Sequence, residues 1–473
     1  MEIIGRKREQ LSLQQYVESD RPEFVAVYGR RRVGKTFLVK EYFNQNFDFY
    51  ISGLAKAKLS EQLENFHLTL LSYGKTPYAK AKNWLEAFRQ LIHLLEKTRK
   101  KGKKIIFIDE LPWFDTPRSG FITGLEFFWN TWASARPDIL LITCGSATSW
   151  MTNKLLNNRG GLHNRVTRRM EIEPFNLCEC EEFFKSKRIL FDKKSIVESY
   201  MVFGGIPFYL NMFEKGLSIT QNIDNLCFRK NAALKNEFSI LYSSLFKKSE
   251  NHINVINTLA KKKKGLSRGN ILAETNIQGG GLTFLLEELE QCGFIRSYNT
   301  YEKKKKERLY QLVDFYSLFY INFIQNEKPK NENFWKNNIE SAKRHVWHGY
   351  AFEQVCMEHI TQIRQKLGIS GIINYAATWR SKNSENGAQI DLLIDRNDNV
   401  INICEIKYAN SEYVIDKNTD ENLRNKRATF IEENKTKKSI HLTMITTYGV
   451  KRNEYWNNIQ SEITLNDLFV NQS

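Results

Sequence analysis

The segment at residues 29–36 restricts the fold of this chain more than any other feature. It reads Gly-Arg-Arg-Arg-Val-Gly-Lys-Thr and lies between an apolar run at residues 24–28 and a helical pattern. Glycines at this spacing let successive backbone N–H groups face a phosphate, and the N-terminus of the following helix adds partial positive charge. Lys35 is expected to reach the β- and γ-phosphates of ATP, and the Thr36 hydroxyl to bind Mg²⁺. The alternative is a glycine turn that binds nothing. The residues expected to contact the nucleotide here are Gly29, Arg30, Arg31, Arg32, Val33, Gly34, Lys35 and Thr36.

Short apolar runs alternate with helical patterns from the N-terminus to about residue 175. This alternation predicts an α/β fold with a parallel sheet. The expected strands are residues 24–28, 47–51, 104–109, 139–144 and 169–172, and the expected helices include 59–71, 84–98 and 121–135.

Two acidic residues end one of these expected strands. Asp109 is placed to hold the Mg²⁺ shell, and Glu110 to polarise the attacking water. Ser146 ends a later strand, where its hydroxyl is expected to sense the γ-phosphate, although Gly-Ser is also common in turns. Hydrolysis of this kind needs an arginine against the transition-state charge, and Arg159 and Arg165 are the candidates. A solvated arginine without a catalytic part is the alternative for each.

The middle of the chain changes to a helical pattern. Beyond it, residues 246–325 show the order helix, helix, helix, hairpin, which predicts a winged helix-turn-helix with lysines 303–306 at the hairpin tip. Lysine runs fit contacts with phosphates. The expected recognition helix at 282–290 is acidic, which argues against direct reading of bases in the major groove, and a protein-interaction or interdomain module is the alternative.

A second group of charged residues lies near the C-terminus. Asp391 and Glu405 are expected on the two strands of one hairpin, with Lys407 on the same face as Glu405. Two such carboxylates bind a divalent metal ion, and a nearby lysine orients or activates the water that attacks a phosphodiester. Glu353 on the preceding helix is a further candidate ligand. The alternatives are a solvated pair of charged strands and a fold that binds DNA without cleaving it.

The net charge of +17 favours a polyanionic partner, of which nucleic acid is the commonest, over a merely lysine-rich surface. Three basic residues near the C-terminus are interpreted as a solvated helix face rather than a phosphate grip. They are Arg424, Lys426 and Arg427.

Four segments together resemble the archaeal-type ATPase family, on the AAA+/STAND side of the P-loop ATPases. They are the loop at 29–36, Ile-Asp-Glu at 108–110, Cys-Gly-Ser at 144–146 and Gly-Gly-Ile-Pro-Phe-Tyr-Leu at 204–210. The family usually has Leu-Tyr-Gly-Arg near its arginine, whereas this chain has Leu-His-Asn-Arg at 162–165, which favours Arg165. The C-terminal Glu, Asp and Glu-x-Lys resemble the PD-(D/E)xK nuclease superfamily.

The resemblance covers nearly the whole chain and implies four domains. They are a P-loop ATPase core at 1–175, a helical lid at 176–245, a winged helix-turn-helix at 246–325 and an α/β nuclease-like domain at 340–473. The implied function is a Mg²⁺-dependent ATPase, acting as a nucleotide switch coupled to DNA binding and to metal-dependent DNA cleavage. The alternative is a regulatory or signalling ATPase whose C-terminal domain is a non-cleaving module that binds DNA or protein.

The remaining sequence features concern location and assembly. The N-terminus lacks the apolar region of a secretory signal, and the chain lacks an apolar run long enough for a membrane span. Seven scattered cysteines without zinc-ligand spacing suggest reduced thiols. A cytoplasmic protein with no membrane partner is therefore expected, and a homo-oligomer stays open.

Overall fold

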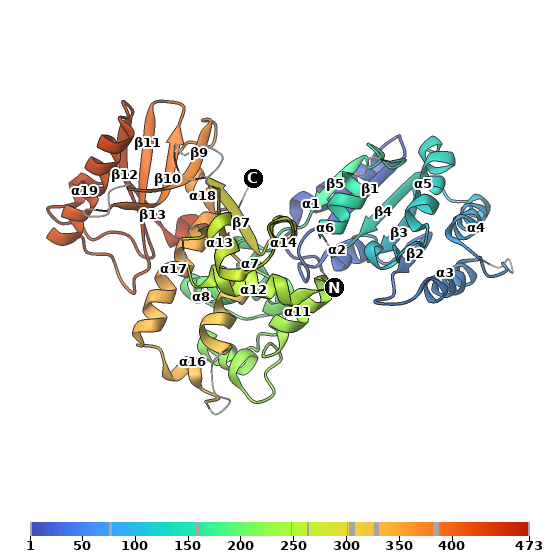
Figure 1. The fold of residues 1–473 in the computed structure, drawn as a ribbon, viewed down its shortest axis with the longest axis horizontal. Coiled ribbons are helices and arrows are strands. Elements are labelled where there is room, and N and C mark those ends of the chain that lie inside the picture. Colours follow the sequence, from blue (N-terminus) through green and yellow to red (C-terminus); the bar gives the residue numbers. More distant parts are fainter. Residues whose placement is uncertain are drawn as a thin grey trace. The chain divides into compact units, whose positions relative to one another are not determined.

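The chain divides into two compact units. The computed structural model describes residues 2–74, 78–146, 148–157, 160–246, 248–262, 264–299, 301, 308–325, 331–381 and 387–471. The N-terminal unit consists of Met1–Pro174 with Glu287–Gly293, and the C-terminal unit of Phe175–Leu286 with Phe294–Ser473 (Figure 1). The first unit ends beside the domain boundary expected at 175. The boundaries expected within the second unit stay predictions.

A five-stranded sheet with the order β2-β3-β4-β1-β5 forms the centre of the N-terminal unit, and all its pairings are parallel. This confirms the α/β prediction. Continuous apolar runs make β3 and β4 buried along their whole length, as expected of strands covered on both faces. The strands are β1 (Glu23–Tyr28), β2 (Phe49–Ser52), β3 (Lys104–Asp109), β4 (Ile139–Cys144) and β5 (Arg168–Glu171).

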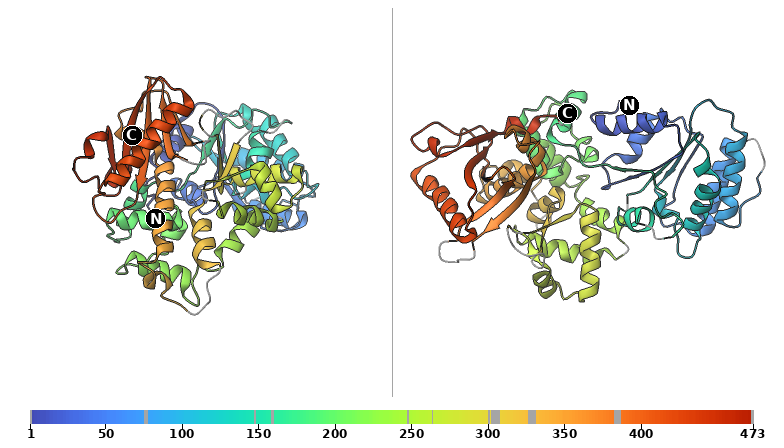
Figure 2. Two further views of the ribbon diagram at one scale, coloured as in Figure 1. Left: turned by 60° about the vertical axis from the view of Figure 1, so that its left-hand side comes forward. Right: turned by 90° about the horizontal axis from the view of Figure 1, so that it is seen from above.

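Helices cover both faces of this sheet (Figure 2). One face packs against α3, α4 and α5 through a core rich in aromatic rings, including Phe49, Phe66, Trp84 and Phe121. Each buried ring of this kind contributes roughly 2–3 kcal/mol of hydrophobic free energy. The other face carries α1 and α2. Their bounds are α1 (Lys7–Glu18), α2 (Lys35–Tyr42), α3 (Leu59–Tyr73), α4 (Trp84–Lys97) and α5 (Phe121–Thr131), with a short α6 (Thr148–Trp150) after β4.

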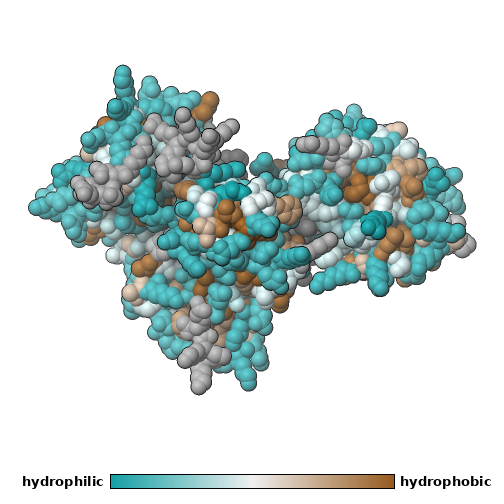
Figure 3. All heavy atoms as spheres, in the orientation of Figure 1, coloured by the Kyte–Doolittle hydropathy of each residue, from teal (hydrophilic) through white to brown (hydrophobic). Residues whose placement is uncertain are grey.

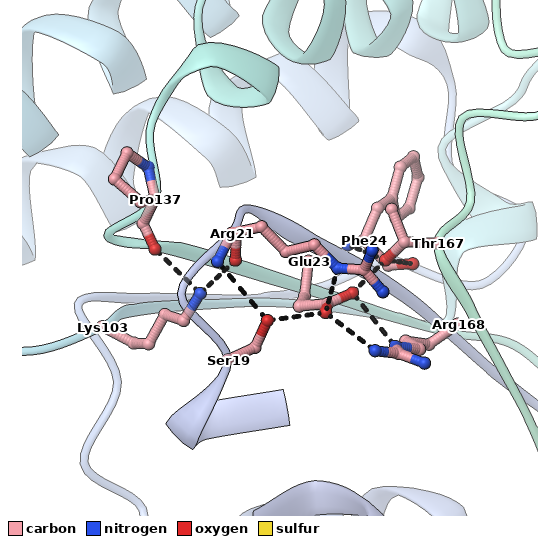
Figure 4. A network of polar contacts seen from close by, with 8 residues as sticks. All are labelled: Ser19, Arg21, Glu23, Phe24, Lys103, Pro137, Thr167 and Arg168. Atoms are coloured by element: carbon pink, nitrogen blue, oxygen red, sulfur yellow. Dashed lines mark hydrogen bonds and ion pairs between the residues drawn. The ribbon is translucent and has the colours of Figure 1, made fainter. Parts of the chain in front are cut away.

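Glu23, at the N-terminal end of β1, is the centre of a polar network (Figure 4). Its fully buried carboxylate accepts hydrogen bonds from Ser19 Oγ at 2.9 Å, from Arg21 Nε at 3.2 Å and from both Arg168 Nε and Nη2 at 3.2 Å. Thr167 Oγ1 donates to the same carboxylate. The network therefore joins the starts of β1 and β5 at the sheet edge opposite the carboxyl ends of the strands.

The C-terminal unit begins with a group of helices. They lead into α12, α13 and α14, and the last residues of α14 belong to the N-terminal unit. The strands β6, β7 and β8 form a three-stranded antiparallel sheet with the order β6-β8-β7. This is the helix and hairpin order that the sequence predicts, whereas lysines 303–306 lie outside the described residues. The winged-helix assignment itself stays a prediction. The elements are α7 (Leu177–Ser186), α8 (Lys193–Phe203), α9 (Pro207–Leu210), α10 (Ile219–Ile223), α11 (Glu237–Leu245), α12 (Ser249–Ala260), β6 (Leu266–Ser267), α13 (Arg268–Thr275), α14 (Gly279–Gln291), β7 (Ile295–Asn299) and β8 (Arg308–Leu312).

A second five-stranded sheet follows, with the order β13-β12-β11-β10-β9. In this sheet β10 pairs antiparallel with β9 and with β11, whereas β12 pairs parallel with β11 and with β13. In the turn of the hairpin between β10 and β11, Asn399 takes a left-handed backbone conformation with φ of 64°. The elements are α15 (Phe315–Phe319), α16 (Phe334–Asn337), α17 (Ala342–Glu358), α18 (Ile360–Lys366), β9 (Asn374–Arg380), β10 (Gln389–Arg396), β11 (Val400–Lys407), α19 (Lys417–Asn434), β12 (Ser439–Thr446) and β13 (Ser461–Thr464).

The surface is mostly hydrophilic on the face that Figure 3 shows, with hydrophobic residues in small scattered groups. Within the described ranges, no helix combines the length and the apolar character that a membrane crossing requires. All seven cysteines are buried free thiols.

Candidate functional site

The loop between β1 and α2 follows a path that its glycines make possible. Gly29 has φ of 129°, and a Cβ atom there would lie 2.3 Å from the carbonyl oxygen of Ile172. Gly34 has φ of 90° and directly precedes the first turn of α2. A side chain at either position would strain the backbone, and at Gly29 it would also collide with the neighbouring segment. Arg30, Arg31 and Arg32 are partly exposed on the same loop, and Val33 is buried.

Lys35 lies inside this loop and is only 5% exposed. Its Nζ donates hydrogen bonds to the carbonyl oxygens of Gly29 at 2.9 Å and of Arg30 at 2.8 Å. Burial lowers the pKa of Lys35, and the nearby Cys144, Glu110 and Asp109 act in the opposite direction. The ammonium group is thus held within the turn that is expected to surround the phosphates.

Thr36 and Asp109 meet at the carboxyl ends of the strands. Thr36 Oγ1 lies 3.1 and 3.0 Å from the two carboxylate oxygens of Asp109, which is 3% exposed. Burial raises the pKa of Asp109, and the charge of Glu110 raises it further. A hydroxyl and a carboxylate that converge in this way are the oxygen ligands that Mg²⁺ prefers, so these residues fit the expected ion.

Glu110 is held in place from the neighbouring strand. Ser146, beyond the end of β4, donates a hydrogen bond from Oγ to Glu110 Oε1 over 2.7 Å. Glu110 also has φ of 48°, which is uncommon for a residue other than glycine. Strained backbone of this kind is concentrated at functional sites, where the surrounding structure holds it.

The two arginine candidates are not among the residues that these contacts bring together. Arg159 lies outside the described residues. Arg165 is exposed, in a turn where its backbone N–H donates to the carbonyl of Leu162 at 3.1 Å. Asn164 has φ of 54° and occupies the position where the resembling family has glycine. Asparagine tolerates this left-handed conformation, so the departure from the family pattern leaves the turn intact.

A cavity of about 1030 Å³ lies in the C-terminal unit. It contains all four residues that the sequence singles out near the C-terminus, namely Glu353, Asp391, Glu405 and Lys407. Lysines from the turn after α12 line the same cavity. The basic residues of the lining are Lys261, Lys262, Lys264, Arg296, Arg380, Lys407 and Lys426.

Glu405 is the most constrained carboxylate of this cavity. It is 7% exposed, and its two oxygens lie 2.9 Å from Lys407 Nζ and 2.6 Å from Lys426 Nζ. Burial acts to raise the pKa of Glu405, but the two ammonium groups hold it below its usual value. Burial also acts to lower the pKa of Lys407, and Glu405 raises it above its usual value.

Asp391 and Glu405 each lie one residue beyond Leu392 and Cys404, the last paired residues of β10 and β11, and their charges interact. A bulge between Ile390 and Leu393 changes the pairing of β10 with β9 at this point. Gln389 Nε2 donates to Asp391 Oδ1 at 2.6 Å. Burial and the charge of Glu405 raise the pKa of Asp391.

Glu353 shares the cavity with Asp391 and Glu405. However, the described residues contain no group of three or more His, Cys, Asp or Glu side chains placed to hold a metal ion. The expected set of three carboxylate ligands is therefore not assembled in this structure.

Comparison with known proteins bears on the first of these sites. Residues 4–213 match the family model described as an ATPase domain predominantly from Archaea. This part of the chain is therefore similar to that family of ATPase domains. An uncharacterised protein of Methanocaldococcus jannaschii is 25% identical over 412 residues, which cover 86% of this chain and 87% of that protein.

Two solved structures are similar to the chain. The Walker-type ATPase of Pyrococcus abyssi has a TM-score of 0.48 at 18% identity, covering 67% of this chain and 96% of that one. The ORC2 protein of Aeropyrum pernix, solved as ADPNP and ADP complexes, has a TM-score of 0.41 at 11% identity, covering 72% and 96%.

Two residues of the N-terminal unit were not expected at its site. Arg6, 5% exposed, donates from Nη2 to the carbonyl of Val33 at 3.1 Å and so supports the loop. Cys144 ends β4, and its side chain interacts with Asp109. The Cys-Gly-Ser segment at 144–146 could have indicated that Cys144 lies at the site, whereas no sequence pattern near Arg6 indicates its contact with the loop.

One expectation for the C-terminal helix is wrong. Lys426 does not lie on a solvated face, because its ammonium group contacts Glu405 inside the cavity. Its neighbours do point elsewhere: Arg424 pairs with Asp420 at 2.8 Å, and Arg427 is exposed. Gln389 and Lys264 also line the cavity without having been expected there.

Proposed function

We propose that this chain is a Mg²⁺-dependent ATPase that acts as a nucleotide switch coupled to DNA binding by its C-terminal unit. The observation that carries the first part is the meeting of Lys35, Thr36, Asp109 and Glu110 at the carboxyl ends of β1 and β3. Ligands of open parallel α/β sheets bind at this edge.

Each residue has a distinct part in this proposal. Lys35 would leave the loop carbonyls to contact the β- and γ-phosphates, and Thr36 and Asp109 would hold Mg²⁺. When bound there, Mg²⁺ would supply positive charge against the phosphate oxygens. Glu110 accepts a hydrogen bond from the attacking water and orients it, because Ser146 fixes its carboxylate. Arg165 remains the proposed residue against the transition-state charge.

Steady-state ATP hydrolysis by the full chain tests these parts. Glu110→Gln is expected to bind ATP normally and to lower kcat by about 100-fold or more, because a positioned base contributes at least that factor. Lys35→Ala is expected to weaken both binding and hydrolysis. The exposed Lys82→Ala serves as the control for loss of a lysine in the same unit. Undiminished hydrolysis in both site variants would refute the assignment.

The basic cavity of the C-terminal unit supports DNA binding. Seven lysines and arginines line it, against three carboxylates. Cations gathered in one cavity favour a phosphodiester backbone, and such binding weakens steeply with salt. The net charge of +17 acts in the same direction.

A second candidate function, metal-dependent cleavage, is favoured by the interacting Asp391 and Glu405 with Lys407 beside them. One experiment addresses both functions, using labelled duplex and single-stranded DNA with Mn²⁺ or with EDTA. Lys261→Glu with Lys262→Glu should weaken binding about tenfold relative to Lys230→Glu, an exposed lysine outside the cavity. Equal affinity of the two proteins would contradict DNA binding in the cavity. Asp391→Ala and Lys407→Ala should abolish nicking, and equal nicking by the parent and both variants would contradict cleavage there.

A further inference from the structure

Both oxygens of the Glu405 carboxylate are engaged by ammonium groups from different elements. Lys407 follows Glu405 on β11, whereas Lys426 reaches the cavity from α19. The distances are 2.9 Å for Lys407 Nζ to Oε1 and 2.6 Å for Lys426 Nζ to Oε2. Divalent cations such as Mg²⁺ and Mn²⁺ bind through carboxylate oxygens, so here they would have to displace an ammonium group.

The formal charges of the two carboxylates and the two lysines around Glu405 also cancel. Asp391 and Glu405 lie on neighbouring strands, line the same cavity, interact electrostatically and carry two formal negative charges. Lys407 and Lys426 supply two positive charges, and Lys426 acts electrostatically on Asp391 as well as on Glu405. An entering divalent cation therefore meets a neutral group instead of a doubly negative pair. Within the described part of the chain, no third carboxylate completes the set. The residues as arranged do not fit a ready metal centre.

We propose that Lys426 is the resident cation of this cavity and competes with a divalent metal ion for Glu405 and Asp391. Lys426 is the residue that must move, because it contacts Glu405 from a separate helix and its side chain is the less exposed of the two lysines, at 18% against 37%. Lys407 shares its strand with Glu405 and stays beside it. This inference deepens the second candidate function by naming what controls metal binding at that site.

Mn²⁺ binding by the full chain tests the proposal without any reaction. Free Mn²⁺ is followed by electron paramagnetic resonance in the absence of nucleotide and DNA. Lys426→Met and Lys426→Gln should each bind Mn²⁺ at least about tenfold more tightly than the parent, because a positive charge in contact with the site is removed. Arg427→Met is the matched control, since it removes the same charge from the next residue of α19, outside the cavity.

Two further variants locate the gained affinity. Adding Glu405→Gln or Asp391→Asn to Lys426→Met should abolish the gain in Mn²⁺ affinity. Any Mn²⁺ bound at the nucleotide site is common to all these proteins and does not change the comparison. A gain of less than tenfold in both folded Lys426 variants would overturn the proposal, as would an equal gain in Arg427→Met. Retention of the gain in both double variants would also overturn it. Because neither hydrolysis nor cleavage is measured, failure here is distinct from failure of the proposed function.

Discussion

A hydrogen bond of 2.7 Å from Ser146 to Glu110 links the ends of two neighbouring strands in the N-terminal unit. Glu110 adopts φ of 48°, so its backbone is in a conformation that a non-glycine residue rarely takes. Ser146 therefore holds the carboxylate of Glu110, a residue whose backbone conformation is unfavourable by itself. A residue that holds Glu110 should affect the chemical step more than the binding of ATP.

Ser146→Ala tests this positioning part. We expect kcat for ATP hydrolysis to fall roughly tenfold, the equivalent of one lost hydrogen bond, while the Kd for a non-hydrolysable ATP analogue changes less than about threefold. Ser134→Ala removes an exposed serine hydroxyl of the same unit and should leave both values unchanged. A purely structural serine would instead alter Tm without this separation of kcat from Kd.

Between elements, the Glu23 network joins the starts of β1 and β5 (Figure 4). Burial acts to raise the pKa of Glu23, but hydrogen bonds from Thr167, Arg168, Ser19 and Arg21 lower it to about 2. A lowered carboxylate pKa stabilises the fold above the unfolded value of about 4.5. This stability is lost as the pH falls from there through about 2.

Glu23→Gln should lower the free energy of unfolding of the N-terminal unit by about 1–3 kcal/mol at pH 7, because it removes the charge that four donors share. Chemical denaturation at pH 7, 4 and 3 measures the effect, and the difference from the parent should shrink toward the lowest pH. Glu18→Gln, an exposed glutamate on α1, is the control. A difference that grew on acidification would contradict the assigned direction of the pKa shift.

Elements with a strong local pattern were predictable from the sequence. The strands β3 and β4 have the expected bounds, because their apolar runs limit them on both sides. The end of α5 was predicted too late: the helix stops at Thr131, and a separate turn covers Ala133–Ala135. At Trp132 the backbone leaves the helical conformation, with φ of −133°, and no residue of the sequence marks that point as a cap.

Contacts between distant segments could not be predicted in the same way. Asp391, Glu405 and Lys407 lie on one hairpin, so the alternation of strand residues places them together. Lys426 belongs to a helix whose placement depends on packing against the finished sheet. Nor did the sequence indicate that the lysines after α12 line the same cavity, since the intervening chain exceeds 100 residues.

At the scale of the whole molecule, the two units should differ in their response to pH. The C-terminal unit buries His348 and His359. Burial lowers the pKa of His348 to about 3, with Arg344, His345 and Lys194 acting in the same direction. Burial lowers the pKa of His359 to about 4, and its hydrogen bond to the carbonyl of Val355 opposes this only in part.

A histidine with a lowered pKa binds fewer protons when folded than when unfolded. Its contribution to stability is complete above about pH 6.5 and is lost as the pH falls toward the folded value. At pH 5 each histidine should therefore cost about 2 kcal/mol of unfolding free energy relative to pH 7. Calorimetry at the two pH values should show the unfolding transition of the C-terminal unit moving to lower temperature. The transition of the N-terminal unit is identified as the one that Glu23→Gln shifts.

The variant His348→Phe isolates this effect, because a phenyl ring keeps contact with Trp347 and Tyr408 but cannot take up a proton. Between pH 7 and pH 5 it should lose about 2 kcal/mol less unfolding free energy than the parent protein. The comparison between variants cancels the contributions of carboxylates such as Asp224 and Asp391, whose pKa values burial raises. The exposed His345→Phe should keep the full pH dependence, since that histidine is in contact with solvent in both states. An undiminished pH dependence in His348→Phe would place the proton uptake elsewhere in the unit.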